Sequence, residues 1–466
     1  MSARECAVYG VRHLIRGGRR RARRLAAASA ARGDYGKPGE PGGRAETRLD
    51  RLGIPHELRW GFLGVLVFML GHGVEASFVA PVIGQGLGNN AVVPTLVAMY
   101  GVAVIIASYM SGALSDLFGP RRVMALGAAI WVIFEACFLF SLHLGSTPLT
   151  MASYFFRGFG YPLFAFSFLV WVNTVVPSKR NGAAVGWFYV MFTGGLPTFG
   201  SLYAVILIPL FGGGYGGEIR TMASSAAFVV AGFLIVWFGV KERQGRSRLA
   251  PEEESAGAVI GSGLRLTVKR PKIFMGFLVR LINTSPEYGM FIILPAVITT
   301  DLKFGQQRWL LMTVAVYAGN IIFNAMFGTI GDHWGWQRTV KWIGITGSAL
   351  GLLAWWYVAH WVTPGSTVGF VLATAAGVIF GIMLAGFVPM GAIMPALAPD
   401  DKGAAIAMYT TAAGGAAFSG AAVVAIVKPW AGNIGVVWAF VALYVVGFIL
   451  VSFLKVDADT KGARAH

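Results

Sequence analysis

The chain has 466 residues, of which 56% are hydrophobic and only 13% are charged, and its mean hydropathy is +0.65. A water-soluble domain carries about 25% charged residues, so this chain has too few ionisable groups to cover a water-facing surface. The composition excludes a soluble enzyme and a disordered regulator, and it predicts an all-α membrane protein. Two cysteines, Cys6 and Cys137, supply neither a disulfide framework nor a metal-binding spacing.

The first 58 residues are predicted to form a basic, disordered N-terminal tail. Residues 1–59 contain 14 Lys/Arg against 6 Asp/Glu, with a basic cluster from Arg19 to Arg24. No apolar segment of about 7–15 residues follows this cluster, so the tail does not have the pattern of a secretory signal peptide. We expect it to lie in the cytoplasm near anionic lipid. No aromatic residues interleave with the arginines, which argues against nucleic-acid binding.

Twelve long apolar runs follow the tail, and each is long enough for a membrane-spanning helix. They lie at 60–84, 92–114, 122–143, 149–176, 183–210, 222–240, 273–299, 309–330, 339–361, 367–396, 404–427 and 433–454. The polar stretch from Lys241 to Pro271 separates six runs from six. The predicted organisation is an N-terminal six-helix bundle (59–240), a cytoplasmic connector (241–271), a C-terminal six-helix bundle (272–456) and a short tail (457–466).

The orientation follows from the distribution of basic residues among the loops. Loops on the same side as the N-terminus carry fifteen Lys/Arg, whereas the opposite loops carry only Arg220, Lys303, Arg308 and Lys428. Basic residues accumulate on the cytoplasmic side of membrane proteins. Both termini are therefore predicted to be cytoplasmic, in a multi-pass protein of the cell inner membrane.

The two halves repeat three short motifs at nearly constant separation. GALSDLFGPRR (112–122) corresponds to GTIGDHWGWQR (328–338), PSKRNGAAVG (177–186) to PDDKGAAIA (399–407), and GHGVE (71–75) to NTSPE (283–287). Small residues that only mediate helix packing would not recur as three motifs at one offset. Two pseudo-symmetric six-helix halves are typical of an alternating-access carrier, with its site between the halves.

GALSDLFGPRR fits the G-x-L-x-D-x-x-G-x-R-R signature of major facilitator superfamily transporters, which lies between the second and third helices. Gly112 lets two helices approach closely, and Asp116 can face a helix N-terminus and an arginine. The resemblance implies a conformational gate formed by Gly112, Asp116, Gly119, Arg121 and Arg122, with Asp332 and Arg338 in the weaker second copy.

Within that superfamily, several segments resemble the polyol permease branch, which contains ribitol and arabinitol transporters. They include LGIPHELRWGFLGVLVFMLGHGVEASF, RGFGYPLFAFSFLVW, VRLINTSPEYGMFIILP and FVPMGAIMPALAPDDKGAAIAMY, and the similarity covers about residues 52–456. It implies import of a linear sugar alcohol by proton symport, without a cofactor, by a monomer. The branch often has aspartate where this chain has His72, which bears on proton coupling.

Ionisable residues at bilayer depth are costly and are usually paired and functional. His72 and Glu75 share one face of the first helix, and Glu75 near Arg157 would form a pair that protonation weakens. Glu135 could replace Glu75 in this pair, and the pair could be purely structural. His72 could carry a proton or act as a neutral hydrogen-bonding group. The predicted proton-coupling residues are Glu75, His72, Arg157 and Glu135.

A polyol presents hydroxyl groups, so its site needs amide, carboxylate and phenol groups. Arg280, Asn283 and Glu287 form one stripe on the seventh helix, and Tyr317, Asn320 and Asn324 form another on the eighth. The asparagines could instead join helices, and the aromatic residues could be packing groups. The predicted substrate-binding residues are Arg280, Asn283, Glu287, Tyr161, Trp187, Asn320, Asn324 and Tyr409, with Tyr189 as a further aromatic candidate.

Several alternatives were weighed against polyol–proton symport. No phosphate-binding loop, HExxH, Cys/His cluster or G-x-S-x-G motif is present, so an enzyme is not expected. A carrier of a small organic anion would use Arg157 and Arg280 as a clamp. TGGLPTFGS (193–201) is only loosely similar to the motif of drug/proton antiporters, and a non-transporting nutrient sensor would keep the cavity but lose the coupling acid.

Overall fold

The computed structural model describes residues 47–51, 54–76, 78–176, 181–250, 254–399 and 401–456. Within these ranges every regular element is a helix. Ten helices there are long and apolar enough to cross a membrane, with mean hydropathies from 1.3 to 2.7. Most of the N-terminal tail and the C-terminal tail predicted from the sequence lie outside the described residues.

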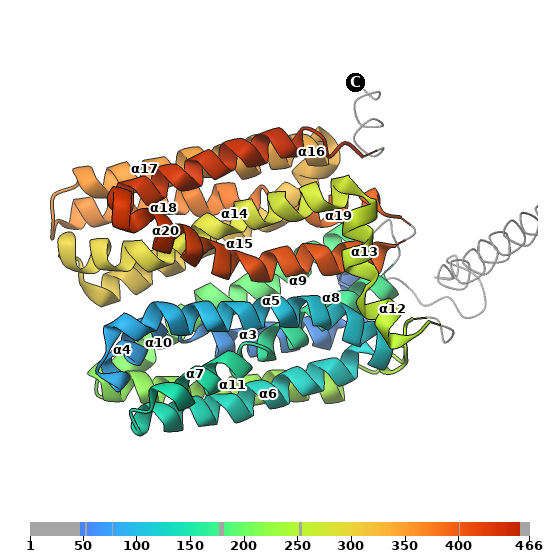
Figure 1. Cartoon of the computed structure of the whole chain (residues 1–466), viewed down its shortest axis with the longest axis horizontal. Coiled ribbons are helices and arrows are strands. Elements are labelled where there is room, and N and C mark those ends of the chain that lie inside the picture. The colour runs from blue at the N-terminus through green and yellow to red at the C-terminus, as the bar shows by residue number, and fades with distance from the viewer. Residues whose placement is uncertain are drawn as a thin grey trace, which may run out of the picture.

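Two groups of helices lie side by side, one from each half of the chain (Figure 1). The N-terminal group contains α3 (Arg59–Gly73), α4 (Val79–Leu87), α5 (Val93–Phe118), α6 (Pro120–His143), α7 (Thr147–Arg157), α8 (Gly160–Val175), α9 (Asn181–Thr193), α10 (Gly200–Leu210) and α11 (Gly214–Gly239). The C-terminal group contains α14 (Pro271–Ala296), α15 (Gly305–Trp334), α16 (Trp336–Thr339), α17 (Ser348–Trp361), α18 (Thr367–Ala385), α19 (Met390–Leu397) and α20 (Lys402–Val451). Short helices α12 (Ala256–Ile260) and α13 (Ser262–Lys269) lie at one end of both groups, which we call the connector end.

The outer faces of these helices are apolar, as the uniform hydrophobicity of the sequence predicts. Ile133, Phe140, Ile322 and Leu350 each expose 57–62% of their surface. Such a surface suits hydrocarbon, where the backbone polar groups are satisfied within each helix. The inner faces instead use glycine to bring backbones together: a Cβ atom on Gly232 of α11 would lie 2.5 Å from the backbone nitrogen of Phe68 in α3. This close packing fixes α3, which carries His72.

Helices break beside Glu75 and Arg157, and the first of these breaks contrasts with the continuous run expected at 60–84. Helix α3 ends at Gly73, the chain passes Glu75 in a turn, and α4 begins at Val79. In this turn the Glu75 carbonyl accepts a hydrogen bond from the Phe78 N–H at 2.9 Å. A second break, at Gly158 and Phe159, follows Arg157 directly and separates α7 from α8. The breaks place Glu75 and Arg157 at helix ends rather than in regular helix.

The last long element, α20, contains one non-helical residue, Gly432, with φ 65° and ψ −169°. Glycine adopts this left-handed backbone without steric cost. The position falls between the two apolar runs predicted at 404–427 and 433–454. Helix α20 therefore consists of two helices that meet at Gly432.

The two groups of helices contact each other at both ends and along α5 and α20. A Cβ atom on Gly112 of α5 would lie 3.2 Å from the Ala407 side chain of α20, and Gly101 similarly faces Phe418. At the end opposite the connector, Gln306 of α15 donates a hydrogen bond to the Glu218 carboxylate of α11 at 3.1 Å. These contacts enclose the middle of the molecule, where the candidate site lies.

Candidate transport site between the two halves

One buried arginine and two glutamates form a cluster inside the N-terminal half. Arg157 and Glu135 are each 1% exposed, and Glu75 is 5% exposed. Arg157 Nη1 donates to Glu75 Oε2 at 2.8 Å, and Nη2 donates to Glu75 Oε1. The same Nη1 also donates to Glu135 Oε2. The sequence left open which glutamate pairs with Arg157, and the structure shows that both do.

Aromatic rings surround the guanidinium group of Arg157. Its central carbon lies 5.0 Å from the ring centre of Tyr154, 5.1 Å from Phe138 and 5.6 Å from Trp131. Aromatic faces attract a cation, and these rings also limit the access of water to the ion pairs. With all three groups ionised the cluster carries one net negative charge, so a single bound proton would neutralise it.

His72 lies beside this cluster and has a defined hydrogen bond. Its Nδ1 accepts the indole N–H of Trp131 at 3.0 Å, and its ring stacks on Tyr161 with centres 4.4 Å apart. An indole can only donate, so Nδ1 must carry a lone pair, and the proton of the neutral ring is assigned to Nε2. Charging His72 would break the bond to Trp131. The geometry is that of the neutral histidine, one of the two roles considered from the sequence.

A central cavity lies between the halves, mostly against the C-terminal one. Six of the predicted substrate-binding residues line it: Arg280, Asn283, Glu287, Asn320, Asn324 and Tyr409. Tyr189 and Thr193 of α9 line the cavity from the N-terminal half. The remaining lining residues belong to the C-terminal half and are Thr284, Leu384, Phe387 and Val388. Tyr161 and Trp187 are not among the lining residues.

Two hydrogen-bond systems arrange the polar groups of the cavity. Tyr317 donates to the Glu287 carboxylate at 2.6 Å. Asn324 donates to the Asn320 amide oxygen at 3.0 Å, and Asn320 donates to the Gly381 carbonyl of α18 at 2.8 Å. Asn320 thus joins two helices, one of the roles considered from the sequence, while both asparagines also face the cavity.

Some polar groups of the cavity have no hydrogen-bond partner within the described part of the chain. They are the Asn283 amide oxygen, the Thr284 hydroxyl, the Tyr189 hydroxyl and the Nε of Arg280. Asn283 is only 2% exposed, so its free amide oxygen can be reached only from inside the protein. Buried polar groups normally have partners, and unsatisfied ones at a cavity point to a polar ligand.

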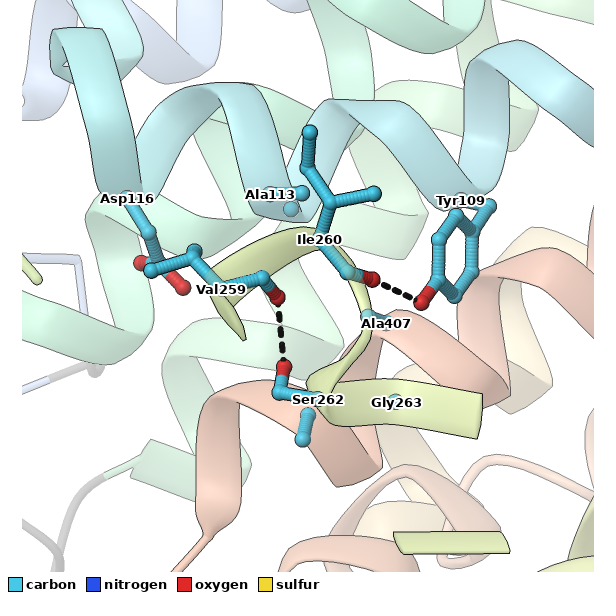
Figure 2. Close-up of a pocket in the computed structure, with 10 residues that line it drawn as sticks. Tyr109, Ala113, Asp116, Val259, Ile260, Ser262, Gly263 and Ala407 are labelled. Carbon is cyan, nitrogen blue, oxygen red and sulfur yellow. Dashed lines mark hydrogen bonds between the residues drawn. The ribbon is translucent and has the colours of Figure 1, made fainter. Parts of the chain in front are cut away.

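Asp116, one of the predicted gate residues, lies beside the connector (Figure 2). Asp116 and Tyr109 of α5 flank the turn between α12 and α13, and Tyr109 donates a hydrogen bond to the Ile260 carbonyl. The backbone carbonyl of Asp116 accepts N–H groups from Leu249 and Ala250, each at 2.9 Å. The connector, for which the sequence predicted no helix, therefore contacts the signature directly.

The other signature residues have varied surroundings. Gly119 has φ 85°, and a Cβ atom there would lie 2.9 Å from the Gly245 and Ser247 carbonyl oxygens. Arg121 donates to the Trp237 carbonyl and stacks on that indole at 4.5 Å. Arg122 and Arg338 are exposed, and the Asp332 side chain is outside the described part.

The sequence model of the Major Facilitator Superfamily matches residues 61–372. The chain belongs to the Major Facilitator Superfamily. An α-ketoglutarate permease of Bacillus subtilis (strain 168) is 34% identical over 88% of this chain and 92% of its own length. A D-arabinitol transporter of Klebsiella pneumoniae is 33% identical over 87% of this chain and 94% of its own length. A ribitol transporter of the same organism is 32% identical over 87% of this chain and 93% of its own length.

Solved structures of the superfamily share the fold. The proton:xylose symporter XylE superposes with a TM-score of 0.67 at 15% identity, over 87% of this chain and 98% of that chain. The human organic anion transporter MFSD10 superposes with a TM-score of 0.64 at 16% identity, over 87% of this chain and 100% of that chain. This Major Facilitator Superfamily chain is a multi-pass membrane transporter and not an enzyme, and its transport requires no cofactor.

Sequence reasoning missed three features of this Major Facilitator Superfamily protein. Trp131 holds His72, Thr193 and Thr284 line the cavity, and α12 and α13 contact the gate. The indole could have been found by its position one helical turn before Glu135. The threonines give no sequence signal because threonine hydroxyls commonly bond to their own helix backbone.

Proposed function

We propose that this protein imports a linear sugar alcohol of the ribitol or D-arabinitol type by proton symport. The observation that carries the proposal is the central cavity, where Asn283 presents a buried, unpaired amide oxygen beside Glu287 and Asn320. Each hydroxyl of a polyol both donates and accepts hydrogen bonds, so it can satisfy such groups. The D-arabinitol and ribitol transporters among its relatives support this substrate class.

Proton coupling is assigned to the Arg157 cluster. Two carboxylates share one guanidinium there, so protonation of Glu75 would weaken one set of charge-assisted bonds and leave the Glu135 bond in place. Glu75 lies at the break after α3, and Arg157 lies at the break after α7. A change in their pairing would alter the contact between two helix ends, which is the step we assign to the change of access.

The proposed topology has twelve membrane spans. The protein lies in the inner membrane of the cell, with both termini in the cytoplasm. Helix α20 supplies two spans, because the 48-residue segment Ala404–Val451 would extend about 70 Å at 1.5 Å per residue, more than twice the hydrocarbon thickness. Helix α3 with the turn that follows it supplies the first span. The excess of basic residues in the connector-end loops supports this orientation.

The proposal is tested with purified protein in proteoliposomes that contain a pH-sensitive dye. Ribitol, D-arabinitol, xylitol and mannitol are added in turn outside the vesicles, with protein-free vesicles as the control. We expect at least one polyol to acidify the vesicle interior as it enters. Polyol entry without a proton signal would contradict symport, and absence of entry by every polyol would contradict the substrate class.

A further inference from the structure

Arg280 is the one cavity-lining residue with a fixed positive charge, and it has no counter-ion among the described residues. Among the described residues, the buried ion pairs join Arg157 to Glu75 and Glu135, and none of them involves Arg280. The Arg280 guanidinium lies against aromatic faces, at 4.9 Å from the ring centre of Tyr409 and 5.3 Å from that of Phe387. Its Nε is buried without an acceptor.

The acid nearest along the helix attracts this charge from a distance, but among the described residues it forms no ion pair with Arg280. Glu287 lies two turns further along α14 and accepts the Tyr317 hydroxyl. The two residues are about 10 Å apart along the axis, at 1.5 Å per residue. An unpaired cation in a low-dielectric site is unfavourable, and aromatic faces compensate for it only in part. An anionic group on the transported solute would complete the compensation.

The rest of the cavity defines the remainder of the solute. Between Arg280 and Glu287 the same helix presents the unpaired oxygen of Asn283 and the unpaired hydroxyl of Thr284. These groups suit hydroxyls along a chain. The Glu287 carboxylate would repel a second anionic group at the far end but would accept a hydroxyl. The lining therefore has one cationic end, a polar middle and one acidic end.

We propose that the preferred solute is a linear polyhydroxy monocarboxylate, with its carboxylate on Arg280 and its hydroxylated tail toward Glu287. The inference rests on the proposed function, because it assumes that this cavity carries a polyhydroxylated chain. It differs from a clamp made of two arginines, since Arg157 is held by Glu75 and Glu135 and does not line the cavity. A sugar alcohol is then the neutral analogue that lacks the anchoring group.

The test compares ligands that share one carbon skeleton and differ at one end. D-ribonate and ribitol are titrated into purified protein by calorimetry, together with the dicarboxylate ribarate. We expect ribonate to bind at least about tenfold more tightly than ribitol, as the gain of one charge-assisted, bidentate contact would give. Ribarate is expected to bind more weakly than ribonate because of Glu287. Uptake of the same three solutes is measured in proteoliposomes.

Variants then assign the difference to Arg280. Arg280→Gln should weaken ribonate binding by about tenfold or more and should weaken ribitol binding less, because ribitol lacks the carboxylate that Arg280 would bind. Arg280→Lys keeps the charge and should retain part of the preference. Arg308→Gln is the matched control, since Arg308 lies over the Phe370 ring and does not line the cavity. Thermal unfolding of each variant shows whether it is folded.

The outcomes separate this inference from the proposed function. Equal binding of ribitol and ribonate, or equal weakening of both by Arg280→Gln, would overturn the carboxylate anchor and leave polyol transport intact. Tightest binding of ribarate would overturn the assignment of the hydroxylated tail to Glu287. Failure of both polyols and their acids to bind or enter would instead overturn the proposed function itself.

Discussion

Arg157 and Arg280 occupy the interiors of the two halves, and both are surrounded by aromatic rings, but only Arg157 has carboxylate partners. Both terminal nitrogens of its guanidinium donate hydrogen bonds to Glu75 or Glu135, and Arg157 does not line the central cavity. Arg280 lies against two aromatic rings, forms no ion pair among the described residues, and lines the central cavity. The same fold therefore holds one buried arginine in ion pairs with two glutamates and another at the cavity without an ion pair. We assign the proton to the first and the solute to the second.

The largest expected effect separates the two arginines by stability. Arg157→Gln would leave Glu75 and Glu135 buried without their cation, which should lower the free energy of unfolding by about 3–5 kcal/mol. Arg280→Gln should leave it unchanged within about 1 kcal/mol, because it removes a charge that has no ionic partner. Thermal or denaturant unfolding in detergent measures both. Equal losses of unfolding free energy in the two variants would contradict the view that only Arg157 is held by ion pairs.

A smaller effect is expected where the signature residue Gly119 meets the connector. Gly119→Ala places a Cβ atom against the Gly245 and Ser247 carbonyl oxygens at a residue with φ 85°. We expect a loss of about 1–3 kcal/mol in unfolding free energy. Gly257→Ala in α12 is the matched control, because no atom lies within 4 Å of its Cβ position. If both variants unfold alike, the contact between the signature and the connector contributes nothing.

The polar middle of the cavity is tested by Asn283→Ala. Loss of the amide should weaken solute binding by about tenfold, the factor for one or two hydrogen bonds of ordinary strength. The half-saturation concentration should rise more than the turnover falls, in uptake measured over a range of solute concentrations. Unchanged affinity would show that Asn283 does not bind the solute. Of the two residues, only Arg280 would then remain assigned to solute binding.

The smallest effect concerns His72. Trp131→Phe removes the N–H that His72 accepts, so we expect a loss of about 0.5–1.5 kcal/mol in unfolding free energy. Transport should keep its proton dependence if the histidine is a neutral positioning group. Loss of proton dependence in this variant, with the fold retained, would move the proton from the Arg157 cluster to His72.

The fold could be predicted from the sequence because its signals are long and uniform. Apolar runs of helical length indicated the helices, and the signature around Asp116 indicated the superfamily, which the family match confirms. The break between Gly73 and Val79 begins where Gly73 packs closely against the Leu196 backbone, a contact between distant segments. Hydropathy reports no such contact.

The candidate site was only partly predictable, for a related reason. Spacing along one helix placed Arg280, Asn283 and Glu287 on one face, and the structure shows all three at the cavity. Whether Glu75 or Glu135 pairs with Arg157 depends on how α3, α6 and α7 approach one another, which spacing within a helix does not report. The same holds for Tyr161, which stacks on His72 instead of lining the cavity.

The most direct test of the separation between proton and solute sites is a paired transport measurement on Glu75→Gln. Proteoliposomes are assayed for solute accumulation driven by a pH gradient and, in parallel, for exchange of labelled solute at equal pH. We expect Glu75→Gln to abolish accumulation and to retain exchange, since the neutral amide cannot release a proton while the cavity is unaltered. Retained accumulation would contradict the assignment of the proton to the Arg157 cluster, and loss of both activities would show that the cluster only holds the fold together.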